Sequence, residues 1–304
     1  MIYLGHHAAT LVLGVLAVVA FTRLSSSLRA PRTSILLWQA STLTIVLSAV
    51  GLLLTAGLQP SARGIVPGLT ALAADLATPA SPLPAAGQLI AVGAGLGTVA
   101  ALVAIQIASS WRCHRRRSRH RHLLRLVASH DVDRDVRVLD HPAVTAYYLP
   151  GRSGCVVVSR GALRALTPDE LTAVLAHEQA HARYRHHVAL APFHALRRAL
   201  PMRPLAAMAN RMDLLVELCA DDAAARRVGR GPLLSALRSM RRRGLLPTAP
   251  PGTLGAAATA LDHRIDRLDR PTPRRRAGAL VPALAVATAL VVAATPLSLF
   301  AFPL

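Results

Sequence analysis

The sequence has few acidic residues and no lysine at all. Charged side chains make up 16% of its 304 residues and hydrophobic ones 53%, and the mean hydropathy is +0.40. These values exclude an ordinary soluble domain. The three cysteines, Cys113, Cys155 and Cys219, are unevenly spaced, which argues against a disulfide framework. The composition therefore favours a membrane protein.

Four apolar stretches are long enough to cross a bilayer, which takes about 20 residues. None contains Asp, Glu or Arg, whose burial at the membrane centre would be costly. We predict an α-helical polytopic membrane protein with about four transmembrane helices. Three lie within residues 1–110, at about 2–21, 35–58 and 85–108, and the fourth lies in 277–304. The segment 59–84 is expected to be a Pro/Ala-rich loop outside the cell.

The arginines give the orientation. All 35 basic residues are arginines. Groups of arginines directly follow the first and third predicted spans and directly precede the fourth, whereas the loop 59–84 holds only Arg63. The positive-inside rule then places both termini outside the plasma membrane and residues 111–276 in the cytoplasm. The formal charge of +20 could also indicate nucleic-acid binding. Because the runs lie beside predicted spans, contact with the lipid bilayer is favoured, and no direct nucleic-acid partner is expected.

Only three glutamates occur, and two of them have the spacing of a zinc peptidase. Residues 177–181 form an H-E-x-x-H pattern, in which His177 and His181 would face one ion from the same side of a helix. Glu217 would be the third ligand. Glu178, rotated about 100° from His177, can reach a water activated by the metal without being a ligand. Asp221 could accept the outer N–H of a ligating histidine.

The same H-E-x-x-H pattern could belong to a charged, solvent-facing helix. Against this, an apolar stripe of Leu171, Val174 and Leu175 precedes the motif, and the apolar runs 214–216 and 223–225 flank the two carboxylates. An unpaired carboxylate would be expensive in such surroundings. Buried carboxylates that face buried histidines indicate a cation, and one Zn²⁺ per chain fits three N/O ligands better than calcium or magnesium does.

Residues 111–276 are predicted to form one mainly helical domain with a β-rich beginning. Short strands are expected at 136–139, 143–149 and 155–159. A helix should begin after Thr167, with Pro168 at its first position and Glu170 completing a capping box. A second helix is expected at about 211–227. His186 and His187 would end the first site helix as C-terminal cations, with metal contact as the alternative.

The runs 146–151, 156–161 and 166–178 resemble the integral-membrane gluzincins, and among these the BlaR/MecR-type peptidases. The resemblance implies three spans before a cytoplasmic, zincin-like α+β domain and one span after it. It also implies His177, His181 and Glu217 as zinc ligands and Glu178 as the general base. The implied substrate is a cytoplasmic protein, with a BlaI-type transcriptional repressor as the leading candidate, cleaved in a regulatory response. The best-known relatives continue past the last span into an extracellular penicillin-binding sensor. Because this sequence stops at Leu304, directly after the fourth predicted span, we expect no such sensor in this polypeptide.

The oxyanion donor is left open among three residues. Residues 263–268 resemble the R-I-x-x-L element of these proteases, which makes Arg264 a candidate to support the site. Tyr147 and His263 are the other candidates for transition-state or substrate support.

Two other functions are alternatives for this sequence. An HtpX-type quality-control protease shares the zinc motif but is expected to place membrane spans before the third ligand. Here the interval 186–212 contains four arginines and three prolines, which makes a span implausible. A non-catalytic zinc-containing signal transducer would predict an incomplete site, whereas this set of residues is complete.

Overall fold

The computed structural model describes residues 2–23, 30–58, 64–79, 84–151, 154–243 and 254–270, together with Leu290. The predicted fourth span lies outside these residues except for Leu290. The chain divides into two compact units, and the boundary falls within one long helix, between Ala104 and Ile105.

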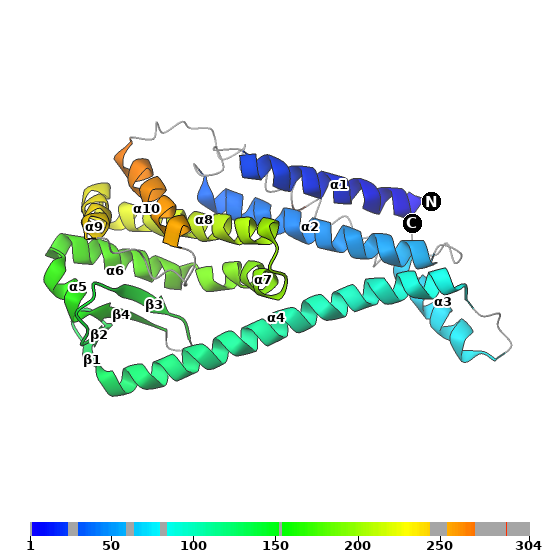
Figure 1. Ribbon diagram of the computed structural model, residues 1–304, viewed down its shortest axis with the longest axis horizontal. Helices are drawn as coiled ribbons and strands as arrows, with labels where there is room; N and C mark the ends of the chain where they lie inside the picture. Colours follow the sequence, from blue (N-terminus) through cyan, green and yellow to red (C-terminus); the bar gives the residue numbers. More distant parts are fainter. Residues whose placement is uncertain are drawn as a thin grey trace. The chain divides into compact units, whose positions relative to one another are not determined.

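The first unit is a set of apolar helices (Figure 1). It contains α1 (Ile2–Arg23), α2 (Pro31–Leu58), α3 (Ile65–Ala77) and the first part of α4 (Ala86–Val127). The helices α1 and α2 pack along each other. Between them, Thr10 Oγ1 lies 2.8 Å from Ser48 Oγ, and the absence of a side chain at Gly51 leaves room for the imidazole of His7. A small apolar core then joins α2, α3 and α4 through Val50, Leu54, Leu58, Ile65 and Val92.

Two of the described helices, α2 and α4, are long and apolar enough to cross a membrane. In α4 only 11% of the apolar window is buried, and Ile90 and Ile107 are 71% and 65% exposed. So large an apolar surface is typical of a contact with lipid or with another protein. The two helices therefore suggest membrane association, while the four-span count and the orientation stay predictions.

Two elements differ from the expectation for this part of the chain. The segment predicted as a loop at 59–84 contains the 13-residue helix α3. The helix predicted to end near Ala108 continues to Val127, so α4 is 42 residues long, or about 63 Å. No glycine or proline interrupts residues 98–127, and arginine is a good helix former, so the change from apolar to basic side chains does not end the helix.

The second unit begins with a four-stranded sheet in the order β1-β2-β4-β3. Its strands are β1 (Ala128–Asp131), β2 (Val136–Leu139), β3 (Ala146–Leu149) and β4 (Cys155–Ser159). The central pair, β2 and β4, is parallel, and the two outer pairs are antiparallel. The strands predicted at 136–139 and 155–159 are confirmed. The strand β3 is shorter than predicted because Ser159 Oγ bonds Ala143 O and Thr145 N, which takes these groups out of the ladder.

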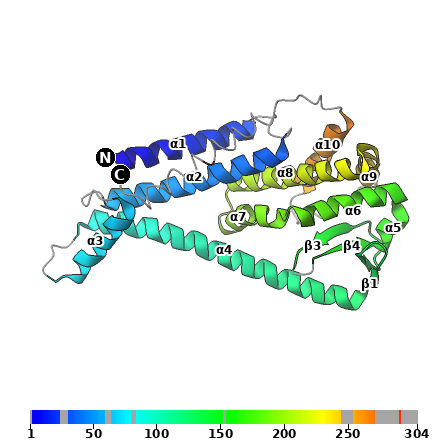
Figure 2. The same cartoon turned by 180° about the vertical axis from the view of Figure 1, so that it is seen from behind.

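In the described part of the chain, six helices follow the sheet. They are α5 (Arg160–Ala165), α6 (Pro168–Arg183), α7 (His186–Ala199), α8 (Arg203–Val228), α9 (Arg230–Arg242) and α10 (Leu254–Asp269). One face of the sheet packs on Leu171 of α6, and the other packs on Leu124 near the end of α4 (Figures 1 and 2). On the far side of α6, a core of Ala173, Ala224, Leu237 and Ile265 joins α6 to α8, α9 and α10. The sheet edge β3 and the helices α6, α8 and α10 thus surround one region.

The second site helix begins earlier than the sequence indicated. We predicted about 211–227, whereas α8 begins at Arg203. Pro204 lies in the first turn of α8, where its missing N–H costs nothing.

The start of α6 confirms the predicted capping box. Thr167 Oγ1 accepts from the Glu170 amide at 3.3 Å, and Glu170 Oε2 accepts from the Thr167 amide at 3.0 Å. Replacing Thr167 with alanine is expected to lower the free energy of unfolding by about 1 kcal/mol. Thr172→Ala is the matched control, because Thr172 is exposed in the same helix and should change stability by less than about 0.5 kcal/mol. Thermal unfolding of both variants measures these changes in stability. Equal losses of stability in the two variants would contradict the role of Thr167 as the helix cap.

Candidate metal centre

Two adjacent helices bring three side chains with metal-binding atoms together. His177 and His181 lie one turn apart on α6, and Glu217 reaches them from α8. The two Nε2 atoms are 3.1 Å apart, and Glu217 approaches His177 Nε2 to 3.3 Å through Oε2 and His181 Nε2 to 3.4 Å through Oε1. In a tetrahedral zinc site with bonds of about 2.0–2.1 Å, neighbouring ligand atoms lie about 3.3–3.4 Å apart. The spacing therefore suits a tetrahedral ion with one position left open.

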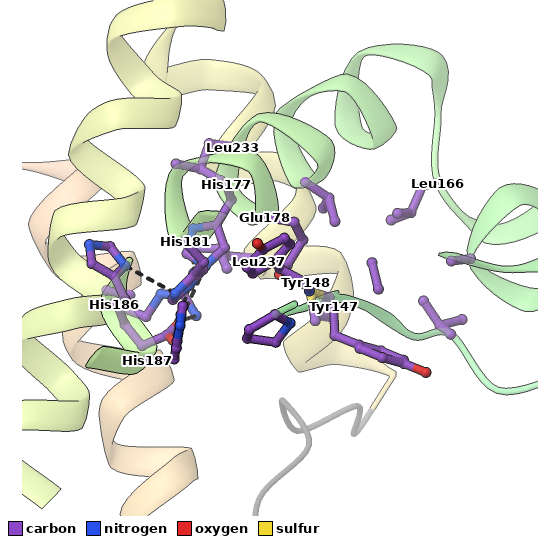
Figure 3. A pocket seen from close by; sticks show the side chains of 18 of the residues that line it. Tyr147, Tyr148, Leu166, His177, Glu178, His181, His186, His187, Leu233 and Leu237 are labelled. Carbon is purple, nitrogen blue, oxygen red and sulfur yellow. Dashed lines mark hydrogen bonds and ion pairs between the residues drawn. The ribbon is translucent and has the colours of Figure 1, made fainter. Parts of the chain in front are cut away.

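Each histidine is held at its other ring nitrogen. His177 Nδ1 lies 2.9 Å from Asp221 Oδ1, the arrangement predicted for this aspartate. His181 Nδ1 lies 3.0 Å from His186 Nδ1, at the start of α7 (Figure 3). If His181 binds an ion through Nε2, its Nδ1–H donates to His186. Partners of this kind fix the tautomer and the ring orientation of a ligating histidine.

His186 does not lie where the sequence predicts it. We expected it to end the first site helix, but α6 ends at Arg183 and His186 begins α7. The break occurs at Arg185, a non-glycine residue in the left-handed region with φ 49°. No glycine or proline marks this turn in the sequence. The C-terminal-cation interpretation is therefore wrong, because His186 lies at a helix start and contacts His181.

Replacing His186 with leucine is expected to weaken zinc binding about 10- to 100-fold, because His181 loses the group that orients it. His186→Gln keeps a carbonyl oxygen that can accept the same hydrogen bond and should retain most of the affinity. Competition against a coloured chelator measures both variants. Equal losses of zinc affinity in the leucine and glutamine variants would contradict the orienting role of His186.

Arg264 of α10 lies against the cluster and is only 5% exposed. Its Nε and Nη2 donate to the two carboxylate oxygens of Asp221 at 2.8 and 2.7 Å, and Nη1 lies 2.9 Å from Glu217 Oε2. The guanidinium therefore bridges the two carboxylates of the predicted E-x-x-x-D run. Through these contacts Arg264 is in a position to hold both carboxylates in place.

The other two candidates for an oxyanion donor are less well placed. His263 is exposed and does not line the site cavity. Tyr147 lines the cavity, but its hydroxyl lies 2.6 Å from His120 Nε2 of α4. Its side chain packs with Leu124 and Val157, on the sheet face that meets α4.

Glu178 lies beside the cluster but outside the set of metal-binding atoms (Figure 3). Its Oε2 accepts a hydrogen bond of 2.8 Å from the Tyr148 amide of the edge strand β3. Burial raises the pKa of Glu178 to about 7, with the nearby Glu217 carboxylate acting in the same direction. The site opens into a cavity of about 310 Å³ that is also lined by His177, His181 and Arg264. A carboxylate of this kind can exchange a proton with a water in that cavity.

Comparison with known proteins bears on the same segment. The family model of Peptidase family M48 matches residues 113–210, about a third of the chain. The match includes His177, Glu178 and His181 and ends before Glu217. It supports a place in the M48 metallopeptidase family. No curated protein and no solved structure matches the chain.

M48 peptidases are zinc metallopeptidases, and the donor set of this chain fits zinc. Two imidazoles and one carboxylate at tetrahedral spacing are a common catalytic zinc set. Burial and the hydrogen bonds around the site also set the protonation states of these side chains. Burial lowers the pKa of His181 to about 4, so it is neutral at pH 7. The pKa of Glu217 is held well below its usual range, because Arg264 and His177 outweigh the opposing effect of burial.

Of the three candidate ligands, His177 is the one that holds a competing proton. Burial and Arg264 lower its pKa, but the hydrogen bonds to Asp221 and Glu217 outweigh both and raise it to about 10. Zinc needs the neutral imidazole, so metal uptake must release this proton. Between about pH 8 and 9, where Glu178 has already lost its proton, zinc affinity should rise about tenfold per pH unit. Calorimetry in buffers of different ionisation enthalpy should find about one proton released per zinc, and an affinity independent of pH would contradict this prediction.

Proposed function

We propose that this chain is a zinc-dependent endopeptidase that cleaves a cytoplasmic protein. The observation that carries the proposal is the cavity in which three ligand atoms at tetrahedral spacing lie beside the Glu178 carboxylate. The M48 match over the H-E-x-x-H segment supports peptide-bond hydrolysis in particular.

His177, His181 and Glu217 would hold the ion, with Asp221 and His186 orienting the two imidazoles. When bound, zinc supplies a Lewis acid that polarises the scissile carbonyl and lowers the pKa of water. Glu178, held by the Tyr148 amide, takes the proton of the attacking water and then delivers it to the leaving amine. Arg264 keeps Glu217 and Asp221 ionised and in place.

For the substrate, we propose a BlaI-type transcriptional repressor, cleaved in a regulatory response at the plasma membrane. The arrangement of the chain supports this proposal. Apolar helices precede the peptidase segment, and between His181 and Glu217 no described helix is long and apolar enough to cross a membrane. The interval is instead taken up by α7 and the first half of α8, which pack together. With both termini outside, the metal centre would lie in the cytoplasm, where such a repressor is found.

The test uses the full chain purified in mild detergent and loaded with zinc. Metal content is measured first, and the protein is then incubated separately with a purified BlaI-type repressor and with an unfolded membrane protein. Cleavage of the repressor at one bond, abolished by a chelator and restored by zinc, is the expected result. Cleavage of the membrane protein alone would favour quality control, and stoichiometric zinc with neither substrate cleaved would favour a non-catalytic transducer. Absence of zinc binding would overturn the proposal.

A further inference from the structure

A second hollow of the same unit lies between α4 and α7, and it differs from the metal cavity in its charge. Its volume is about 1300 Å³. On α4, residues at every fourth position face it, which places them on one side of the helix. We call it the basic groove, and the arginines that line it are Arg117, Arg121, Arg125, Arg185 and Arg198.

The arginines of the basic groove have no acidic partner within the described part of the chain. Of the other lining residues, His194 pairs with Asp213, which lies outside the lining, at 2.7 Å. No carboxylate is among the groove's described lining residues. Its five arginines form no ion pair with a described Asp or Glu, in contrast to Arg264 and Arg267, which pair with aspartates. The polar contacts that the groove arginines do make are with neutral groups: Arg121 donates to Pro150 O at 2.7 Å, and Arg198 donates to Ser109 Oγ at 3.1 Å. Arginines gathered in this way attract a ligand that brings carboxylates or other anionic groups.

The basic groove is continuous with the metal cavity. Tyr148, Pro150, His187 and Leu190 line both hollows. Tyr148 is also the residue whose amide holds Glu178. A polypeptide lying in the groove therefore passes directly to the catalytic carboxylate.

We propose that the basic groove binds an acidic segment of the polypeptide that the metal centre cleaves. This inference rests on the proposed peptidase function and specifies its substrate class: a protein with a cluster of Asp or Glu close to the scissile bond. Arginine suits the role because its guanidinium binds carboxylates in a bidentate manner.

Anionic lipid headgroups are the other ligand that such a surface could attract, and the geometry of α4 argues against them. Arg117 and Arg125 lie about 14 and 26 Å beyond Ala108 along the helix axis, where the predicted span ends. Electrostatic attraction to a lipid surface decays over about 8 Å at physiological salt. The arginines next to the span, such as Arg112, are better placed for lipid, whereas those of the groove lie closer to the metal cavity.

The experiment measures peptide binding with full-length, zinc-loaded protein carrying Glu178→Gln, so that no cleavage interferes. The probe is a fluorescein-labelled 14-residue peptide with four Asp and four Glu, and its partner has Asn and Gln at the same positions. The groove variant is Arg117→Gln/Arg125→Gln. Its matched control is Arg112→Gln/Arg119→Gln, which removes the same charge from the same helix outside the groove lining.

We expect the acidic peptide to bind at least about tenfold more tightly than the amide peptide at low salt. The groove variant should lose most of this preference, the control should stay within about twofold of the parent, and Arg117→Lys/Arg125→Lys should retain much of it because the charge is kept. Equal affinity for the two peptides would overturn the inference, as would equal losses in groove and control variants. A groove variant that loses binding to phosphatidylglycerol nanodiscs but keeps peptide binding would identify a lipid site and also overturn it.

Failure of this inference and failure of the proposed function are separable. Peptide binding is scored without catalysis, so a protein that lacks peptidase activity can still show the acidic preference. Conversely, zinc-dependent cleavage with no preference for the acidic peptide would leave the peptidase assignment intact and remove only the groove from its substrate recognition.

Discussion

Replacing Glu178 with glutamine should lower kcat by about 10²- to 10⁴-fold and leave the zinc content unchanged. The amide has almost the shape of the carboxylate, and its oxygen can still accept the hydrogen bond from the Tyr148 amide. It cannot take a proton from water at neutral pH. Because Glu178 is outside the set of metal-binding atoms, the loss should appear in the rate and not in metal affinity. Rates on the substrate that the wild type cleaves, with zinc measured in the same samples, check both parts.

The chain offers a matched control in Glu170→Gln. This is the same chemical change eight residues earlier on the same helix, at the capping box, where glutamine can replace glutamate. Glu170 also accepts a hydrogen bond from Ser235 Oγ at 2.6 Å, so a small loss of stability is expected without a loss of rate. A Glu178→Gln rate within tenfold of the Glu170→Gln rate would remove Glu178 from its role as base.

Much of the site could be predicted because short spacings in sequence fix directions on a helix. His177 and His181 are four residues apart, and once α6 was recognised from its capping box, both imidazoles had to face the same side. The same spacing places Glu217 and Asp221 on one side of α8. What the sequence could not provide was the pairing of these two helices, which depends on a core of small residues such as Ala173 and Ala224.

The residues that were misplaced depend on backbone breaks or on distant contacts. His186 was assigned to α6 because nothing between Tyr184 and His187 is a usual helix terminator, yet Arg185 adopts a left-handed conformation there. The strand β1, with the sequence Ala-Ser-His-Asp, has no alternation of apolar residues and is formed by pairing with β2. The polar half of α4 was also not predicted, because it is an exposed helix and has no apolar stripe that would indicate a helix in the sequence.

Replacing Arg264 with methionine should destabilise the metal-free protein by about 3–5 kcal/mol. The guanidinium pairs with Glu217 and with both oxygens of Asp221, and the Arg264 and Asp221 side chains are only 5% and 1% exposed. Methionine fills a similar volume but leaves the buried Asp221 carboxylate and the half-buried Glu217 carboxylate with His177 as the main remaining cation. Arg267→Met is the matched control on the same helix, because Arg267 pairs with Asp222 at a more exposed position, where less than about 1 kcal/mol is expected.

Zinc should reduce the difference between the two variants, and this distinguishes charge balance from packing. A dication bound by His177, His181 and Glu217 lies next to the carboxylates that lost their arginine, so it supplies part of the missing positive charge. The rise in melting temperature on adding zinc should therefore be larger for Arg264→Met than for Arg267→Met, as followed by tryptophan fluorescence with chelator or with zinc. If the rise is equal in both variants, Arg264 contributes through packing alone, and the two carboxylates do not depend on it for their charge. If Arg264→Met is as stable as Arg267→Met without metal, the buried ion pairs are not what holds α10 against the site.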